Sequence, residues 1–114
     1  MQINKNFDLT TYIHDYGVPV IFEPERPEDF MVGDKIVVNF ESNVDDKIFE
    51  VRQTDFRFEM SLTPAEAASF TLDDDQGYIE IPYSIKHYRA GVCLDTIVNA
   101  KLIVWRTVPW QPNS

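Results

Sequence analysis

Residues 56–81 read FRFEMSLTPAEAASFTLDDDQGYIEI, and this stretch carries the clearest signal for the fold. In its first part apolar residues alternate with polar ones: Phe56, Phe58, Met60 and Leu62. Because successive side chains of a strand point to opposite faces, this period of two predicts a β-strand with one buried face. Residues 78–81 begin a second alternation, with Ile79 and Ile81 on one face. The stretch therefore predicts two strands and a connector between them.

The connector contains a predicted short helix over residues 63–70, TPAEAASF. Thr63 can cap its first turn, Pro64 suits the first helical position, and Glu66 stands three residues after Thr63, as a capping box requires. The turn-forming residues 73–77, DDDQG, then predict where the next strand begins.

The same period of two predicts strands over residues 34–41, 78–85 and 96–107. Shorter strand candidates lie at residues 18–23 and 47–52. Turn-forming residues separate them at 32–34, 42–46 and 89–91. Strands at this spacing with one short helix predict an all-β fold, an antiparallel sandwich or small barrel of about seven strands.

The length of 114 residues and an aromatic content of 13% fit a single packed domain over residues 1–114. Within it, residues 1–10 are interpreted as an N-terminal arm and residues 108–114 as an extended tail. The single cysteine, Cys93, has no partner for an internal disulfide, so a reducing cytosolic origin is permitted.

Charge and hydropathy argue against a nucleic-acid partner and against a membrane span. The net charge is -9, and the basic residues are scattered along the chain, so a nucleic acid is a poor candidate. No run of eighteen apolar residues and no basic start with an apolar segment is present, so we expect neither a membrane span nor a signal peptide.

The aspartates of residues 73–75 raise the question of a cation site. An EF-hand loop with Gly77 at its sixth position would place Leu72 and Tyr83 at ligand positions, so that motif fails. Asp73, Asp75 and Glu80 are weak metal candidates, but a solvated turn explains them with fewer assumptions. We expect no metal and no other cofactor.

Catalytic constellations are weak in this sequence. Cys93, His87 and Asp95 supply the residue types of a nucleophile, a base and an orienting group, but Cys93 between two apolar residues is typical of a small strand residue. The acidic pairs are interpreted as a solvated loop: Glu25 and Glu28, Asp29 and Asp34. We therefore expect no catalytic residues and no enzymatic activity.

Protein contacts are the better supported hypothesis. If Val98, Leu102 and Val104 face the core, then Ile103 and Trp105 point to the opposite face of the strand. There they could be covered by the N-terminal segment, pack on a second sheet, or contact a partner protein. Trp110 follows in the tail, and Pro82 predicts a strand at an edge or paired on one side. The N-terminal arm, with Ile3 and Phe7, could pair with such an edge on a neighbouring copy.

The order of four segments resembles the immunoglobulin-like β-sandwich module of bacteriophage tail and baseplate proteins, as in the N-terminal domain of upper baseplate proteins. The segments are VGDKIVVNF (32–40), FRFEMSLTPAEAASF (56–70), GYIEIPYSI (77–85) and LDTIVNAKLIVW (94–105). The resemblance covers about residues 31–107 and rests on Gly33, Asp34, Leu62, Thr63, Glu66, Ala67, Gly77, Tyr78, Asp95, Thr96 and Ile97.

This resemblance implies a non-enzymatic structural or adaptor protein of a phage or prophage particle. It further implies other virion or tail proteins as partners, a homo-oligomer or repeated assembly, and a location in the virion, otherwise the cytoplasm. The alternative hypothesis is a small β-sandwich that binds a carbohydrate or another small ligand through Trp105, Trp110 and tyrosines.

Overall fold

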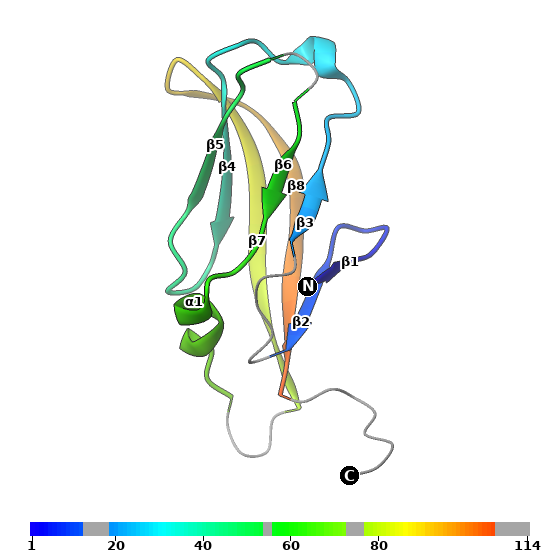
Figure 1. The fold of residues 1–114 in the computed structure, drawn as a ribbon, viewed down its shortest axis with the longest axis vertical. Helices are drawn as coiled ribbons and strands as arrows, with labels where there is room; N and C mark the ends of the chain where they lie inside the picture. Colours follow the sequence, from blue (N-terminus) through cyan, green and yellow to red (C-terminus); the bar gives the residue numbers. More distant parts are fainter. Residues whose placement is uncertain (13–18, 54–55, 73–76, 107–114) are drawn as a thin grey trace.

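The computed structural model describes residues 1–12, 19–53, 56–72 and 77–106, which form two β-sheets and one short α-helix (Figure 1). The strands are β1 (Gln2–Ile3), β2 (Leu9–Tyr12), β3 (Val20–Phe22), β4 (Lys35–Phe40), β5 (Lys47–Glu50), β6 (Phe58–Met60), β7 (Tyr78–Arg89) and β8 (Val92–Trp105). A single 3-10 turn, η1 (Pro27–Asp29), lies between β3 and β4. The predicted all-β class is confirmed.

The larger sheet, sheet A, has the strand order β1-β2-β8-β7-β4-β5, and sheet B consists of β3 and β6. Every pair is antiparallel except β2 and β8, which run parallel with Leu9 beside Leu102. The prediction of a wholly antiparallel arrangement is therefore wrong. A hairpin forces its two strands to be antiparallel, but β2 and β8 come from opposite ends of the chain, so no hairpin sets their direction.

The long hairpin of β7 and β8 is the central feature of sheet A (Figure 1). Its two turn residues, Ala90 and Gly91, both have positive φ angles, of 51° and 79°. This conformation matches the twist of the flanking strands and closes the hairpin with two residues. As a result β8 begins at Val92, earlier than the expected residue 96.

The predicted helix is confirmed as α1 (Pro64–Ser69). Thr63 Oγ1 accepts a hydrogen bond from the Glu66 amide, and the Glu66 carboxylate accepts one from the Thr63 amide. This capping box fixes the start of the helix. In the part of the chain that the model describes, no helix is long and apolar enough to cross a lipid bilayer.

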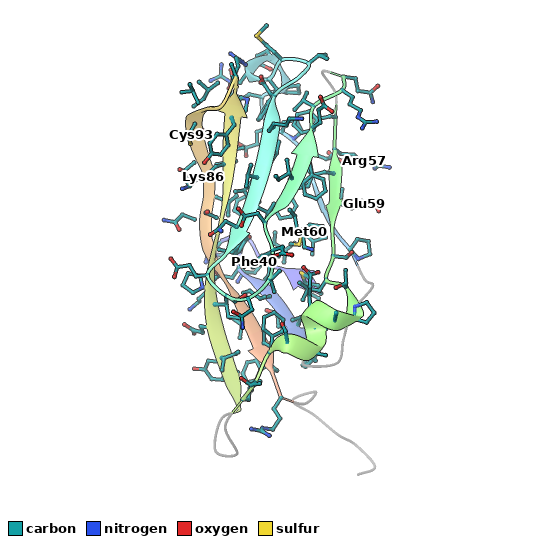
Figure 2. The ribbon with its side chains drawn as sticks, turned by 90° about the vertical axis from the view of Figure 1, so that its left-hand side faces the viewer. Phe40, Arg57, Glu59, Met60, Lys86 and Cys93 are labelled. Carbon is teal, nitrogen blue, oxygen red and sulfur yellow. The ribbon has the colours of Figure 1, made fainter. Side chains whose placement is uncertain are left out.

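The core lies between the two sheets. Figure 2 shows Phe40 and Met60 between the layers, Lys86 and Cys93 on the outer side of sheet A, and Arg57 and Glu59 on the outer side of β6. The alternating apolar residues of β4, β6, β7 and β8 supply much of this core, as predicted. Its largest fully buried apolar members are Leu9, Ile36, Val38, Val51, Met60, Tyr83, Ile85, Leu102 and Val104.

The first ten residues do not extend from the domain as an arm. β1 and β2 join sheet A, where Leu9 is fully buried beside Leu102. The turn between them carries Phe7, whose backbone oxygen accepts a hydrogen bond from the hydroxyl group of Tyr83. The N-terminal segment is therefore held to the core by pairing within the chain.

Pro82 does not mark an edge strand, because β7 lies between β8 and β4. β4 ends at Phe40, opposite Tyr83, so residues 78–82 of β7 pair with β8 alone. The Pro82 carbonyl accepts a hydrogen bond from Glu41 on that side, just past the end of β4. The second expectation for Pro82 was a strand that pairs on one side only, and this is confirmed for residues 78–82. Such pairing explains why the missing amide hydrogen is tolerated.

Candidate functional site: a cleft at the open edge of the sandwich

The two edges at which sheet A meets sheet B differ. At one edge the rings of Phe49 in β5 and Phe58 in β6 stack with their centroids 4.5 Å apart. Beside them, Lys47 Nζ lies 2.8 Å from Glu66 Oε1, which ties β5 to α1. These contacts close that edge, whereas at the opposite edge β3 and β8 are separated by a cleft.

The first part of β8 has a free strand edge. β8 pairs with β7 along its whole length, but β2 reaches only Leu102–Trp105. Within the described residues, Val92–Ala100 therefore has no strand on its second side, and we call this segment the free edge. Every residue from Val92 to Ile97 is exposed, including the apolar Val92, Leu94 and Ile97.

Two β-bulges shape the free edge. The register between β7 and β8 shifts at Ile85/Lys86 and at His87/Tyr88, which leaves Ile97 and Leu94 of β8 without opposite residues. A bulge bends its strand and turns a side chain in a new direction. Here the first bulge lets Asp95, Ile97 and Val98 all line the cleft.

The cleft has a volume of about 360 Å³, which falls within the range of small-ligand sites. One wall comes from β7 and β8, the other from β3, the segment after it and residues around β6, and Phe7 adds to the lining. Its apolar residues are Phe7, Phe22, Pro24, Phe30, Ile36, Phe56, Phe58, Ile85, Ile97 and Val98. Its charged or titratable residues are Glu23, Glu25, Arg26, Asp29, His87 and Asp95.

A buried polar cluster supports the wall formed by β7. Asp34, 2% exposed, accepts two hydrogen bonds of 2.9 Å from Arg89, through Nε and one terminal nitrogen. The same carboxylate lies 2.6 Å from His87 Nε2 and accepts a hydrogen bond from the Met31 amide. The cluster thereby fastens the turn before β4 to the end of β7.

The electrostatics of this cluster keep Asp34 ionised. The hydrogen bonds from Arg89 hold the pKa of the Asp34 carboxyl group well below its usual range, against the opposing effect of burial, and the Met31 amide and His87 act in the same direction as Arg89. A carboxylate acceptor at Nε2 places the proton of a neutral imidazole on that nitrogen, which leaves Nδ1 as an acceptor.

His87 is the buried polar residue of the cleft. Its ring, 4% exposed, packs against the ring of Phe30 at a centroid distance of 4.3 Å. Among the described residues, every fully buried side-chain nitrogen or oxygen atom has a hydrogen-bond partner. His87 Nδ1 has no such partner there, so it is not fully buried. Nδ1 is therefore accessible to solvent, and His87 lines the cleft.

The interpretation of Asp34 as part of a solvated acidic loop is wrong. Glu25, Glu28 and Asp29 are exposed as expected, but Asp34 is buried because Arg89 compensates its charge and His87 forms a hydrogen bond with it. No local pattern indicates this, since Arg89 lies 55 residues further along the chain.

The three residue types of a catalytic triad do not converge. His87 and Asp95 are register partners facing the cleft, whereas Cys93 pairs with Tyr88 and lies on the outer side of sheet A (Figure 2). The Cys93 thiol donates a weak hydrogen bond to the Asp95 backbone oxygen, and His87 is engaged by Asp34. Cys93 belongs to the last strand, as expected, although it is exposed.

The outward residues of β8 form part of a row across three strands. Tyr12 of β2, Trp105 of β8 and Tyr78 of β7 are register partners on the outer face of sheet A. Trp105 is half-buried and packs on Tyr78 with ring centroids 4.8 Å apart. Ile103 lies half-buried in the next row, beside Thr10. The N-terminal strand thus pairs beside these residues and does not cover them.

The other candidate residues lie apart from one another. Glu80 is on the outer face, 3.1 Å from Lys101 Nζ, while Asp73, Asp75 and Trp110 lie outside the described residues. Ile3 is exposed at the β1 edge, and Phe7 lines the cleft. In the portion of the chain described, no three His, Cys, Asp or Glu side chains are grouped to hold a metal ion.

Comparison of the chain with protein-family models, with curated protein sequences and with solved structures gives no match.

Proposed function

We propose that this chain is a non-enzymatic structural or adaptor protein of a phage or prophage particle, in which an immunoglobulin-like sandwich makes protein contacts within a repeated assembly. Its place would then be the virion, next to other tail or baseplate proteins and to copies of itself. The proposal combines the ordered resemblance of four sequence segments with the surface of sheet A.

The observation that carries the proposal is the free edge of β8. A strand edge presents unpaired backbone donors and acceptors, and a long exposed edge with apolar side chains is normally covered. Here the free edge includes Val92, Leu94 and Ile97, each at least 44% exposed. A second chain that pairs with this edge would satisfy the backbone groups and bury these side chains.

The oligomeric state tests the proposal. Size-exclusion chromatography with light scattering is run on the chain alone and on mixtures with the products of neighbouring genes. We expect a homo-oligomer or a stable complex with at least one such product. A strict monomer that binds none of them would contradict the proposal.

A second candidate function is the binding of a carbohydrate or another small ligand. The row Tyr12, Trp105 and Tyr78 favours it, because aromatic faces suit stacking against sugar rings. A titration with oligosaccharides, monitored by tryptophan fluorescence, separates the two functions. Only ligand binding predicts a saturable shift that is lost on Trp105→Phe.

A further inference from the structure

We propose that the cleft binds an extended segment of a partner protein that carries both apolar residues and lysine or arginine. The segment pairs with the free edge of β8 and inserts its apolar side chains between β8 and β3. This inference rests on the proposed function and specifies the chemistry of the partner.

Backbone geometry provides the first argument. Lys101 N donates to Asp8 Oδ1, so the backbone groups of Lys101 point away from β7. Backbone groups of alternate strand residues point to the same side, and Asn99, two residues earlier and opposite Ser84, directs its amide and carbonyl groups to the free edge. A strand laid beside β8 can therefore donate to and accept from Asn99.

The interior of the cleft provides the second argument. Phe22, Phe58, Ile85, Ile97 and Val98 offer an apolar surface to inserted side chains. Among them Ile97 is 44% exposed and gains the most burial from an occupant. His87 also lines the cleft at this place, so a hydrogen-bonding group on the partner has a defined position.

The charge of the rim selects a basic partner. Glu23, Glu25, Asp29 and Asp95 contribute four carboxylates, against one guanidinium group from Arg26. Arg26 is itself paired with Glu28 at 3.3 Å and with Asp29 at 3.6 Å. Complementary charge accelerates association and rejects acidic partners.

The same features disfavour a second copy of this edge as the occupant. Two acidic rims would meet in a symmetric pairing, and each chain carries a net charge of -9. The bulges at Ile97 and Leu94 also interrupt the flat edge that two identical strands would need. A narrow segment from a different protein surface avoids both problems.

The test uses a fluorescein-labelled peptide of alternating lysine and valine, with the sequence KVKVKVKVK, measured by fluorescence anisotropy against the full chain. The matched probes are EVEVEVEVE, with reversed charge, and KVKVPVKVK, with one interrupted backbone donor. We expect saturable binding of the first peptide, which weakens as salt is raised, and at least about tenfold weaker binding of the other two.

Variants of the chain locate the binding site. Asn99→Pro removes the amide hydrogen at the free edge, and Asn99→Ala keeps it while also shortening the side chain. Asp95→Lys changes the rim, and Glu59→Lys makes the same charge change on the outer side of β6. We expect Asn99→Pro and Asp95→Lys to lose about tenfold or more in affinity. The two controls should bind like the wild type, and circular dichroism verifies that all four are folded.

Several results would overturn this inference. They are equal binding of the lysine and glutamate peptides, no saturable binding, and equal effects of Asp95→Lys and Glu59→Lys. Complexes with neighbouring gene products that form equally well with Asn99→Pro and Asp95→Lys would also overturn it, while the proposed function would stand. A chain that binds the lysine peptide but remains a monomer with every partner would contradict the proposed function alone.

Discussion

Asp34 Oδ2 and His87 Nε2 lie 2.6 Å apart and join the turn before β4 to the third residue from the end of β7. The same carboxylate accepts two hydrogen bonds from Arg89, which also donates one to the Asp29 backbone oxygen. A carboxylate, an imidazole ring and a guanidinium group thus meet beside the cleft. The wall that carries His87 is therefore positioned by Asp34.

Asp34→Asn should destabilise the fold. The substitution keeps the shape of the side chain but removes the charge that compensates Arg89, and one oxygen acceptor becomes a donor. We expect a loss of about 2–3 kcal/mol in the free energy of unfolding, measured by urea denaturation. The control Asp29→Asn removes a carboxylate from an exposed ion pair and should cost less than about 0.5 kcal/mol. Equal losses would contradict the assigned role.

The stability contribution of Asp34 should decrease in acid. Its pKa is lowered in the folded state relative to 3.8, chiefly by the hydrogen bonds from Arg89. A depressed carboxyl pKa adds stability above the unfolded value, and this stability is lost as the pH falls below that value. The difference in unfolding free energy between wild type and Asp34→Asn should therefore be full at neutral pH and shrink below about pH 4.

Urea denaturation of both proteins over this pH range measures that difference. Burial alone would raise the pKa of Glu66, but the hydrogen bond from Lys47 and the contacts with Thr63 together lower it. Glu66 titrates in both proteins, so its effect cancels when they are compared. A difference that stays constant down to pH 2 would show that the Asp34 charge does not act as described.

The sequence predicted features that depend on near neighbours in the chain. The alternation from Phe56 to Leu62 defines an inward face, and the spacing of Thr63 and Glu66 defines a cap, because both are properties of local geometry. In contrast, the burial of Asp34 depends on Arg89, 55 residues away, and aspartate before a strand is ordinarily solvated.

The open edge could not be predicted for the same reason. Outward and inward residues of β8 follow from the period of two, but the length over which β2 covers β8 depends on pairing between Leu9 and Leu102. Nothing near Val92 in the sequence indicates that its strand lacks a second neighbour. The cleft arises from this missing pairing, and the bulge at Ile97 that shapes it has no glycine to mark it.

Thr63→Ala should destabilise the chain through the capping box. The hydroxyl group accepts a hydrogen bond of 3.1 Å from the Glu66 amide, and Glu66 also bonds Lys47 of β5. Loss of an N-cap hydroxyl group costs about 1 kcal/mol. Thermal denaturation should show this loss, whereas Thr63→Ser, which keeps the acceptor, should lie within a few tenths of a kcal/mol of the wild type. A destabilised serine variant would indicate that the threonine methyl group matters instead.

Two substitutions in the hairpin turn should change the stability of the chain in opposite directions. Ala90 and Gly91 both have positive φ angles, which cost energy for an alanine and little for a glycine. Ala90→Asn should therefore stabilise the chain by about 0.5 kcal/mol, since asparagine tolerates this region better and Asn-Gly suits a two-residue hairpin. Gly91→Ala should destabilise it by about 1 kcal/mol through backbone strain alone, because an added Cβ would meet no atom within 4 Å.

Gly77→Ala is the matched control for the hairpin pair. An added Cβ there also meets no atom within 4 Å, but the φ angle of Gly77 is not positive. Alanine at such a position restricts the unfolded chain and should leave the melting temperature unchanged or slightly raised. If Gly77→Ala and Gly91→Ala lowered the melting temperature equally, the loss could not come from the left-handed turn. The melting temperature should be highest for Ala90→Asn and lowest for Gly91→Ala. This order tests the turn that places the free edge beside the cleft.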